Sequence, residues 1–565
     1  MLFTCFSIGI LVFCLSQSAC GQPLNQKGKF TRQDTLRGTI TPERAWWNVT
    51  RYDLYVAPQF KTKTLSGHNR ISFTVSSYSR NRKMQIDLQQ PMQIDSVVFE
   101  NKKLSFKRNG NVFLVEFGQR FSAKPRLLPG ESASPKQYAV TVYFSGKPRE
   151  AINPPWDGGW IWKKDNKGRP WMTVACQGLG ASVWYPCKDH QADEPDQGAT
   201  LQIRVPDSLS AVGNGQLKSE TNNGDGTTTW TWEVKNPINN YNIVPYIGKY
   251  VHTMDKYIGE TEKNLSLDYW VLDYDAEKAK QQFDRDVKRM LKAFEYWFGP
   301  YPFYEDGYKL VESSHLGMEH QSATAYGNHF LNGYLGGDLS GSGWGLKWDY
   351  IIVHESGHEW FGNSITSNDI ADMWIHEGFT MYSEVLFVEY YYGKKAADEY
   401  LQGLRLGISN DRPLIGTYGV NQEGSGDMYN KGANLLHTIR QIIGDDSLFR
   451  RILRGLNKDY YHKTIDSKDV EAYFSRLSGK NLSKIFDQYL RTTKIPVLEY
   501  KITGDRLSYR WANTVAGFDM PVQLANGGDW LRPTNQWKAT AMTKEMKSGG
   551  LQVSKNFYIT VSKTE

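Results

Sequence analysis

The chain has 565 residues, of which 40% are hydrophobic and 22% charged, and its net charge at neutral pH is +7. This length allows three or four domains, each with a buried core. The positive charge is spread along the chain without runs of Lys and Arg, so we exclude nucleic acid as an expected partner.

The first 21 residues are expected to be an export signal. Leu2 to Leu15 form an apolar run that is too short for a membrane span, and Ser16 to Gly21 supply the small residues of a cleavage region. The ending Ser-Ala-Cys-Gly is similar to a bacterial lipoprotein box, so lipidation of Cys20 and ordinary cleavage near Gly21 both stay open. We expect an exported protein, periplasmic or extracellular, that contacts a membrane only through a lipid anchor at Cys20.

Residues 22–250 are expected to form an all-β domain with two packed sheets. Strand-like alternation recurs at 52–56, 71–75, 84–88 and 96–99, and Asn109-Gly110 and Asp225-Gly226 are typical of hairpin turns. Cys176 and Cys187 are the only cysteines well past the leader. A disulfide and two buried free thiols are equally compatible with their positions.

The spacing of apolar residues becomes helical from Ala276, and we expect a mixed α/β domain over 251–495. This domain should contain a strand at 308–312, a Gly-rich loop at 332–345 and helices through 435–443, 449–453, 470–474 and 485–490. Strand patterns return at 497–502, 507–511 and 557–561, so we expect a small C-terminal β-domain over 496–565. The predicted fold class is therefore multidomain α+β.

A metal-binding pattern lies in the middle domain, where Ile351 to Asn363 reads IIVHESGHEWFGN. We predict a helix over this stretch, ended by Gly362-Asn363. His354 and His358 would then lie one turn apart on one face, where two imidazoles can hold one metal ion. Glu355 lies about 100° around the helix, which suits a general base that reaches the attacking water.

A second helical pattern follows and supplies the third ligand that a catalytic zinc ion usually needs. Glu377 comes eighteen intervening residues after His358 and can project onto the same ion. Glu384 lies seven positions further, on the same helix face, where it can orient a ligand histidine. The sequence predicts one Zn²⁺ per chain, held by His354, His358 and Glu377.

These residues resemble those of the gluzincin aminopeptidases, the family that includes aminopeptidase N and the leukotriene hydrolase. HESGHEWFGN is similar to the family's H-E-x-x-H-x-W-F-G-N, and WIHEGFT is similar to W-L-N-E-G-F-A with His376 in place of Asn. The resemblance implies a β-sandwich-like N-terminal domain, a thermolysin-like catalytic domain and, as substrates, peptides with free N-termini. It implies the same roles for His354, His358, Glu377 and Glu355.

The resemblance also implies roles that spacing alone does not reveal. Gly317-Met318-Glu319 matches the family's exopeptidase signature, with Leu316 and His320 replacing a Gly and an Asn, and Glu319 would hold the substrate's amine. Alignment of Pro186 to Asp189 with the family's P-C-x-D places Gln177 beside that amine. Tyr429, in a Y-x-K-G pattern, would stabilise the oxyanion. We expect a protonated His320 to compete with substrate for Glu319 as the pH falls through about 6.5.

The expected activity is hydrolysis of the N-terminal peptide bond. A zinc endopeptidase of similar geometry and a lipid epoxide hydrolase, which occurs among specialised members of the resembled family, stay open as alternatives. A non-catalytic binding protein on this fold would be expected to lack Glu355 or a metal ligand, and all of these residues are present.

Overall fold

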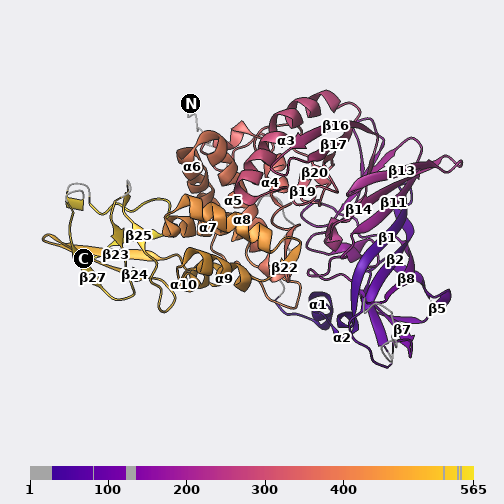
Figure 1. Cartoon of the computed structure of the whole chain (residues 1–565), viewed down its shortest axis with the longest axis horizontal. Helices are drawn as coiled ribbons and strands as arrows, with labels where there is room; N and C mark the ends of the chain where they lie inside the picture. The colour runs from indigo at the N-terminus through magenta and orange to yellow at the C-terminus, as the bar shows by residue number, and fades with distance from the viewer. Residues whose placement is uncertain (1–27, 81, 122–134, 526–527, 544–545, 548–549) are drawn as a thin grey trace, which may run out of the picture.

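The computed structural model describes residues 28–80, 82–121, 135–525, 528–543, 546–547 and 550–565. The expected export signal and Cys20 lie outside these residues. Strands of the N-terminal part and strands of the C-terminal part lie at opposite ends of the molecule, with the helices between them (Figure 1). The predicted multidomain α+β class is confirmed. In the described part of the chain, no helix is both long and apolar enough to cross a membrane.

The N-terminal domain is built around a long strand whose alternate residues are buried. Its largest sheet contains β1 (Trp47–Gln59), β2 (Thr64–Val75), β4 (Gln93–Phe99), β5 (Lys102–Leu104), β8 (Gln137–Gly146), β11 (Ala199–Pro206), β13 (Gln216–Asn222) and β14 (Thr227–Val234). The spatial order is β13-β14-β11-β1-β2-β8-β4-β5. β1 pairs antiparallel with β2 and parallel with β11, so it lies in the interior of the sheet.

In the described part of the N-terminal domain the remaining strands form two further sheets, so the expectation of two sheets is wrong. One holds β3 (Arg82–Asp87), β6 (Phe106–Asn109) and β7 (Val112–Gly118), and the other holds β9 (Gly159–Lys164), β10 (Pro170–Ala175), β12 (Ser210–Val212) and β15 (Tyr246–Gly248). Alternation identifies a strand because side chains of one face are buried. It does not identify the pairing partner, which comes from a distant part of the sequence.

Among the residues described before β1 there are two short helices, where the sequence led us to expect no helix. α1 (Arg32–Gly38) begins at a capping box of Thr31 and Asp34, and α2 (Pro42–Ala45) begins with a proline at its first position. Arg37 and Arg44 attach these helices to the β-domain through ion pairs with Asp189 (3.1 Å) and Asp87 (2.7 Å). The Thr-x-x-Asp spacing is the signal that predicts α1.

The middle domain has a five-stranded sheet beside a group of helices. The sheet order is β16 (Tyr250–Ile258), β17 (Asn264–Leu272), β18 (Tyr308–Glu312), β20 (Thr324–Tyr326) and β19 (Gly317–Met318), with β19 at the edge. The helices are α3 (Ala276–Phe298), α4 (Tyr350–Gly357), α5 (Trp374–Tyr392), α6 (Lys394–Leu404), α7 (Asn430–Ile443), α8 (Asp446–Asp459), α9 (Ser467–Ser478) and α10 (Ser483–Arg491). A short pair, β21 (Ile365–Ser367) and β22 (Lys463–Ile465), joins α4 to α9.

α4 ends earlier than the sequence indicated, so the predicted helix over Ile351 to Asn363 is wrong at its C-terminal end. The amides of Glu359 and Trp360 donate to carbonyls three residues back, which tightens the chain into turns after Gly357. Gly362 has a φ of +130°, which a side chain would strain. His358 caps the helix in right-handed helical conformation, so it still lies one turn after His354.

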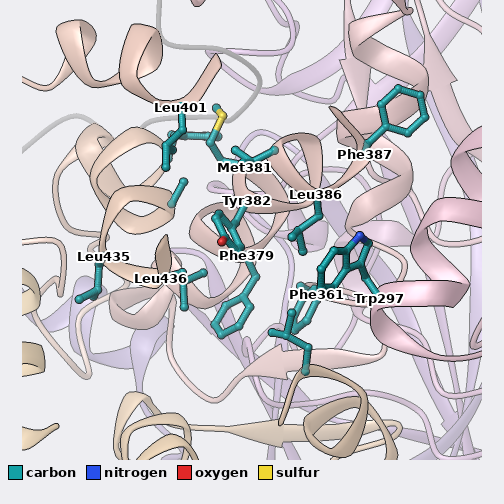
Figure 2. Packing of buried hydrophobic residues seen from close by; sticks show 14 of the residues in the cluster. Trp297, Phe361, Phe379, Met381, Tyr382, Leu386, Phe387, Leu401, Leu435 and Leu436 are labelled. Atoms are coloured by element: carbon teal, nitrogen blue, oxygen red, sulfur yellow. The ribbon is translucent and has the colours of Figure 1, made fainter. Parts of the chain in front are cut away.

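α5 is enclosed over most of its length, because every residue from Trp374 to Val388 is buried. Figure 2 shows its Phe379, Met381, Tyr382 and Leu386 among Trp297 of α3, Leu401 of α6 and Leu435 and Leu436 of α7. Each large apolar side chain buried in this way contributes about 1.5–3 kcal/mol. The packing fixes the rotation of α5 and therefore the direction of Glu377 and Glu384.

The C-terminal part is a small β-domain. Its strands are β23 (Val497–Thr503), β24 (Arg506–Ala512), β25 (Val522–Gln523), β26 (Trp530–Leu531), β27 (Lys538–Ala541) and β28 (Thr560–Lys563). They form one sheet of order β27-β24-β23-β28 and the pair β25-β26. The strand predicted at 557–561 begins only at Thr560. Phe557 and Tyr558 are buried before it, and the Tyr489 hydroxyl of α10 donates to the Tyr558 carbonyl (2.7 Å).

Candidate metal centre

Three side chains from two helices meet in the interior of the middle domain. One ligand atom from each of His354 and His358, at α4, and Glu377, on α5, lies within 4.8 Å of the others, and all three residues are buried. His354 Nε2, His358 Nε2 and Glu377 Oε2 have no hydrogen-bond partner in the described part of the chain. Two imidazole nitrogens and a carboxylate oxygen pointing at one another are the donor set of a catalytic zinc site, so these residues fit the ion.

The outer nitrogens of both histidines are fixed by neighbours. His354 Nδ1 lies 2.5 Å from Glu384 Oε1, and the Tyr400 hydroxyl donates to the other Glu384 oxygen (2.6 Å). His358 Nδ1 lies 3.0 Å from the Phe361 carbonyl oxygen, which can only accept. With Nδ1 protonated in each ring, Nε2 carries the lone pair that a metal ion needs. The structure thus places Glu384 where its helical position predicted.

Glu355 lies between the metal ligands and the edge strand β19. A Cβ atom added to Gly317 would lie 2.7 Å from Glu355 Oε1 and 3.0 Å from Ile351 Cδ1. The strand therefore passes directly over α4, and only a glycine allows this approach. Gly317 and Met318 form the two residues of β19, and Glu319 follows them.

Glu319 sits at the end of β19 and is held by residues of the N-terminal domain. Its Oε1 accepts hydrogen bonds from Gln177 Nε2 (2.5 Å) and from the Tyr241 hydroxyl (2.8 Å). One carboxylate oxygen of Glu319 lies within 4.8 Å of ligand atoms of Glu355 and His358. Burial and the nearby Glu377 carboxylate raise the pKa of Glu319, and the hydrogen bond from Tyr241 acts in the opposite direction. The structure brings Gln177 and Glu319 together across 142 positions of sequence.

His320 is directed away from Glu319, so the expected competition with substrate is wrong. Its Nδ1 lies 2.5 Å from the hydroxyl of Tyr246 on β15, and that hydroxyl donates to the Ala323 carbonyl oxygen (2.7 Å). Nδ1 of His320 is therefore the donor in the first of these bonds. Burial and the neighbouring His315 lower the pKa of His320 well below its ordinary value. His320 lies in the segment that follows β19, which we call the Glu319 loop. Its neutral imidazole links this loop to Tyr246 of the N-terminal domain.

His376, the other departure from the resembled family, also has a structural partner. Its Nε2 accepts a hydrogen bond from the Ser367 amide (2.9 Å), which links α5 to β21. Burial lowers the pKa of His376 to about 3, so the ring stays neutral beside the Glu377 ligand.

Tyr429 lies at the start of α7 with its ring against a metal ligand. The ring centroids of Tyr429 and His354 are 6.1 Å apart at an interplanar angle of 26°. Tyr429 is 5% exposed, and its position beside the cluster is compatible with a donor to a negative oxygen.

Several contributing residues were missed in the sequence. Tyr241 had no signal, because a tyrosine among 33 gains meaning only from its hydrogen bond to Glu319. Asn363 lies within the motif itself, and its Nδ2 donates to the Glu319 carbonyl (2.8 Å), so the motif's final residue could have been assigned a role.

Cys176 and Cys187 are both buried free thiols, which settles the choice that the sequence left open.

The fold and the site together define a protein with a two-histidine, one-carboxylate metal centre beside an edge strand. Comparison with known proteins then identifies the protein family. The model of the peptidase family M1 domain matches residues 281–489, and the model of the M1 N-terminal domain matches residues 48–241. The chain belongs to peptidase family M1.

Similar proteins show how much of the chain is shared. Aminopeptidase B of Mus musculus is 24% identical over 355 residues, which are 58% of this chain and 51% of that protein. A probable aminopeptidase 2 of Sulfurisphaera tokodaii is 22% identical over 480 residues, 82% of this chain and 56% of that protein. The chain thus spans about half the length of these relatives.

A solved structure shares the fold over most of both chains. The crystal structure of an M1 zinc metallopeptidase from Deinococcus radiodurans aligns with a TM-score of 0.64 and 20% identity, covering 80% of this chain and 94% of the other. At this identity the likeness concerns the fold alone.

Proposed function

We propose that this chain is a zinc aminopeptidase, which hydrolyses the first peptide bond of peptides with a free amino terminus. The observation that carries the proposal is the buried Glu319 carboxylate beside the metal ligands. Gln177 and Tyr241 both donate to its Oε1, so they fix the carboxylate in one orientation. An anionic group in a site that largely excludes water binds an ammonium group strongly. With the amine there, the first carbonyl reaches the metal ligands.

When bound, zinc polarises the carbonyl and lowers the pKa of a coordinated water from about 15.7 towards about 7. Glu355 supports the reaction as the general base. Its carboxylate lies beside both His358 and Gly317, between the ligands and the edge strand along which the substrate would lie. It takes the proton of the attacking water and returns it to the leaving amine. The Tyr429 hydroxyl donates to the oxygen that becomes negative in the transition state.

We also propose that the protein is exported, because residues 1–21 read as a signal. The lipoprotein-like Ser-Ala-Cys-Gly supports an anchor at Cys20 as one of two outcomes, ordinary cleavage being the other. Mass spectrometry of the mature N-terminus distinguishes a diacylated Cys20 from a cleaved, unmodified end.

The aminopeptidase proposal is tested with one peptide prepared with a free and with an acetylated amino terminus. Wild type should cleave the free form only, and Glu319→Ala should lose most of this preference. Equal cleavage of both forms by wild type would favour the endopeptidase alternative. Hydrolysis of a lipid epoxide without peptide cleavage would favour the third alternative.

A further inference from the structure

A loop beside the metal centre leaves three leucines exposed in one place. Leu331, Leu335 and Leu346 are 44%, 45% and 45% exposed. A Cβ added to Gly336 would lie 3.7 Å from Leu331 Cδ1, and one added to Gly333 would lie 3.3 Å from Leu346 Cδ2. The leucines therefore gather around the turn at Tyr334, whose amide and that of Gly337 bond to each other's carbonyls. We call these three residues the leucine rim.

The rim is attached firmly to the helix that carries the metal ligands. Asn328 Nδ2 lies 2.8 Å from the carbonyl oxygens of Leu331 and Gly333 and 2.9 Å from Asp349 Oδ1, and Asn328 Oδ1 accepts from the Leu335 amide (2.8 Å). Asp349 is also the N-cap of α4, where it accepts from the amides of Ile351 and Ile352. Loop and helix thus share one buried carboxylate. A surface held in this way binds without a large ordering cost.

Aromatic rings connect the rim to the metal centre on the side away from Glu319. The ring centroids of Tyr334 and Tyr350 are 5.4 Å apart, and those of Tyr350 and His354 are 5.1 Å apart. Glu319, by contrast, lies next to His358. Gly317 of β19 lies against Ile351 in the first turn of α4. A peptide whose amine is held at Glu319 and whose first carbonyl is at the ligands would run along β19 past Gly317, and its following residues would extend towards Tyr334 and the rim.

The chemistry of the rim is apolar. Within 328–347 the only acidic side chain is Asp338, and both of its oxygens accept hydrogen bonds from the loop itself, from Ser340 and Gly343. The only Lys or Arg in the same stretch is Lys347, whose ammonium lies 4.4 Å from the centroid of the Trp344 ring. No free charge of this segment faces a ligand that approaches the leucines.

We infer that the leucine rim binds the side chains that follow the cleaved bond, and that the enzyme selects peptides with apolar second and third residues. This inference rests on the proposed aminopeptidase function and adds the substrate class. Burying one large apolar side chain against such a surface changes the specificity constant kcat/KM by roughly tenfold.

The test compares two tripeptides with the same first residue, one continuing with Leu-Leu and one with Ser-Ser. For wild type, kcat/KM for the apolar peptide should exceed that for the polar one by roughly tenfold. The double variant Leu331→Ser/Leu335→Ser should bring this ratio close to one. Leu217→Ser is the matched control, because Leu217 is equally a leucine, 39% exposed, on β13 of the N-terminal domain, and it should keep the wild-type ratio.

Failure of this inference is distinguishable from failure of the proposed function. Cleavage of both peptides with equal kcat/KM by wild type overturns the rim as a binding surface and leaves the aminopeptidase intact. Absence of cleavage of either peptide, and of a single-residue anilide, overturns the aminopeptidase itself. A ratio unchanged in the double variant, together with a wild-type dimer that this variant converts to monomer in analytical ultracentrifugation, makes the rim an interface between two copies and overturns the inference.

Discussion

Glu319 and Glu355 are two buried carboxylates that both lie next to His358, yet their surroundings give them different tasks. Glu319 receives two hydrogen bonds on one oxygen from the N-terminal domain, which suits it to the proposed role of holding the substrate's amine. Glu355 lies on the metal helix under Gly317, where its position suits proton transfer. The difference comes from position, since the two side chains are chemically identical.

Replacement of Glu355 by Gln should separate metal binding from catalysis. The amide keeps the shape of the side chain and cannot accept the proton, so turnover should fall by at least about 10²-fold. Zinc content, measured by elemental analysis, should stay at one per chain. His358→Ala is the comparison, since it should lose both zinc and turnover. Full turnover in Glu355→Gln would remove the general base from the mechanism proposed above.

Tyr246→Phe should weaken substrate binding, because it leaves the buried His320 Nδ1 without its partner. An unsatisfied buried donor costs about 1–3 kcal/mol, and a share of this loss should loosen the Glu319 loop and raise KM roughly fivefold to tenfold. We expect kcat to change much less, since Glu355 and the ligands are untouched.

The matched control is Tyr250→Phe, which removes a buried hydroxyl that donates to the Glu312 carbonyl (2.9 Å), outside the Glu319 loop. His320→Asn, which restores the residue of the resembled family, should keep KM near the wild-type value if an amide replaces the imidazole in this bond. An equal rise of KM in the two tyrosine variants would reduce Tyr246 to a purely structural role.

At the residue scale the sequence was informative where one short segment carries the geometry. His354, Glu355 and His358 lie within five positions, and helical spacing is enough to orient them. Gln177 and Tyr241 reach Glu319 from positions 142 and 78 residues away, and only the fold brings them there. The expectation for His320 failed because the sequence does not reveal the Tyr246 hydroxyl.

At the scale of elements, the contact between β19 and α4 depends on the absence of a side chain at Gly317. Gly317→Ala places a methyl group 2.7 Å from Glu355 Oε1, so the base or the strand must shift. We expect kcat/KM to fall by about 10²-fold, the consequence of a misplacement near 1 Å. Zinc content should be unchanged, because the three atoms nearest to the added methyl group belong to Glu355 and Ile351, neither of which is a metal ligand. Wild-type activity in this variant would show that the strand can retreat without cost.

The sequence predicted least well where helices end and which strands share a sheet. Apolar periodicity predicted α3, α7 and most strands, because burial follows directly from it. It continued the metal helix as far as the expected stop at Gly362-Asn363. In the structure the helix ends at Gly357, and the following amides donate to carbonyls three residues back. Whether strands join one sheet or three depends on partners that no local pattern specifies.

At the scale of the whole molecule, His190 of the β-domain links this domain to α1, the first helix that the structure describes. The His190 Nδ1 accepts from the Ala192 amide (3.1 Å), so Nε2 carries the proton and faces the Gly38 carbonyl oxygen (3.3 Å) at the end of α1. Burial, with the charges of Arg44 and Arg37, lowers the pKa of His190 to about 3. Protonation would break the bond from Ala192.

This geometry predicts a pH-dependent contribution to stability. The folded pKa lies below the ordinary 6.5, so the unfolded chain binds the extra proton, and the contribution is complete above about pH 6.5 and declines as the pH falls towards 3. Between pH 8 and pH 5, the stability of wild type relative to His190→Gln should decrease by about 2 kcal/mol. Urea unfolding at both pH values measures it. A difference between wild type and His190→Gln that stays constant between pH 8 and pH 5 would contradict the assignment.

The hydrogen bonds to Glu319 cross the boundary between two domains, with Gln177 and Tyr241 on one side and the carboxylate on the other. The residues proposed to cleave the bond, by contrast, all lie in the middle domain, on α4, α5 and the start of α7. Glu319 and the proposed catalytic groups therefore lie in the middle domain, whereas the two donors that orient Glu319 come from the N-terminal domain. A change in how the two domains sit together would alter which bond is cut while leaving the capacity to cut intact, so the position of cleavage can evolve without any substitution at the metal centre.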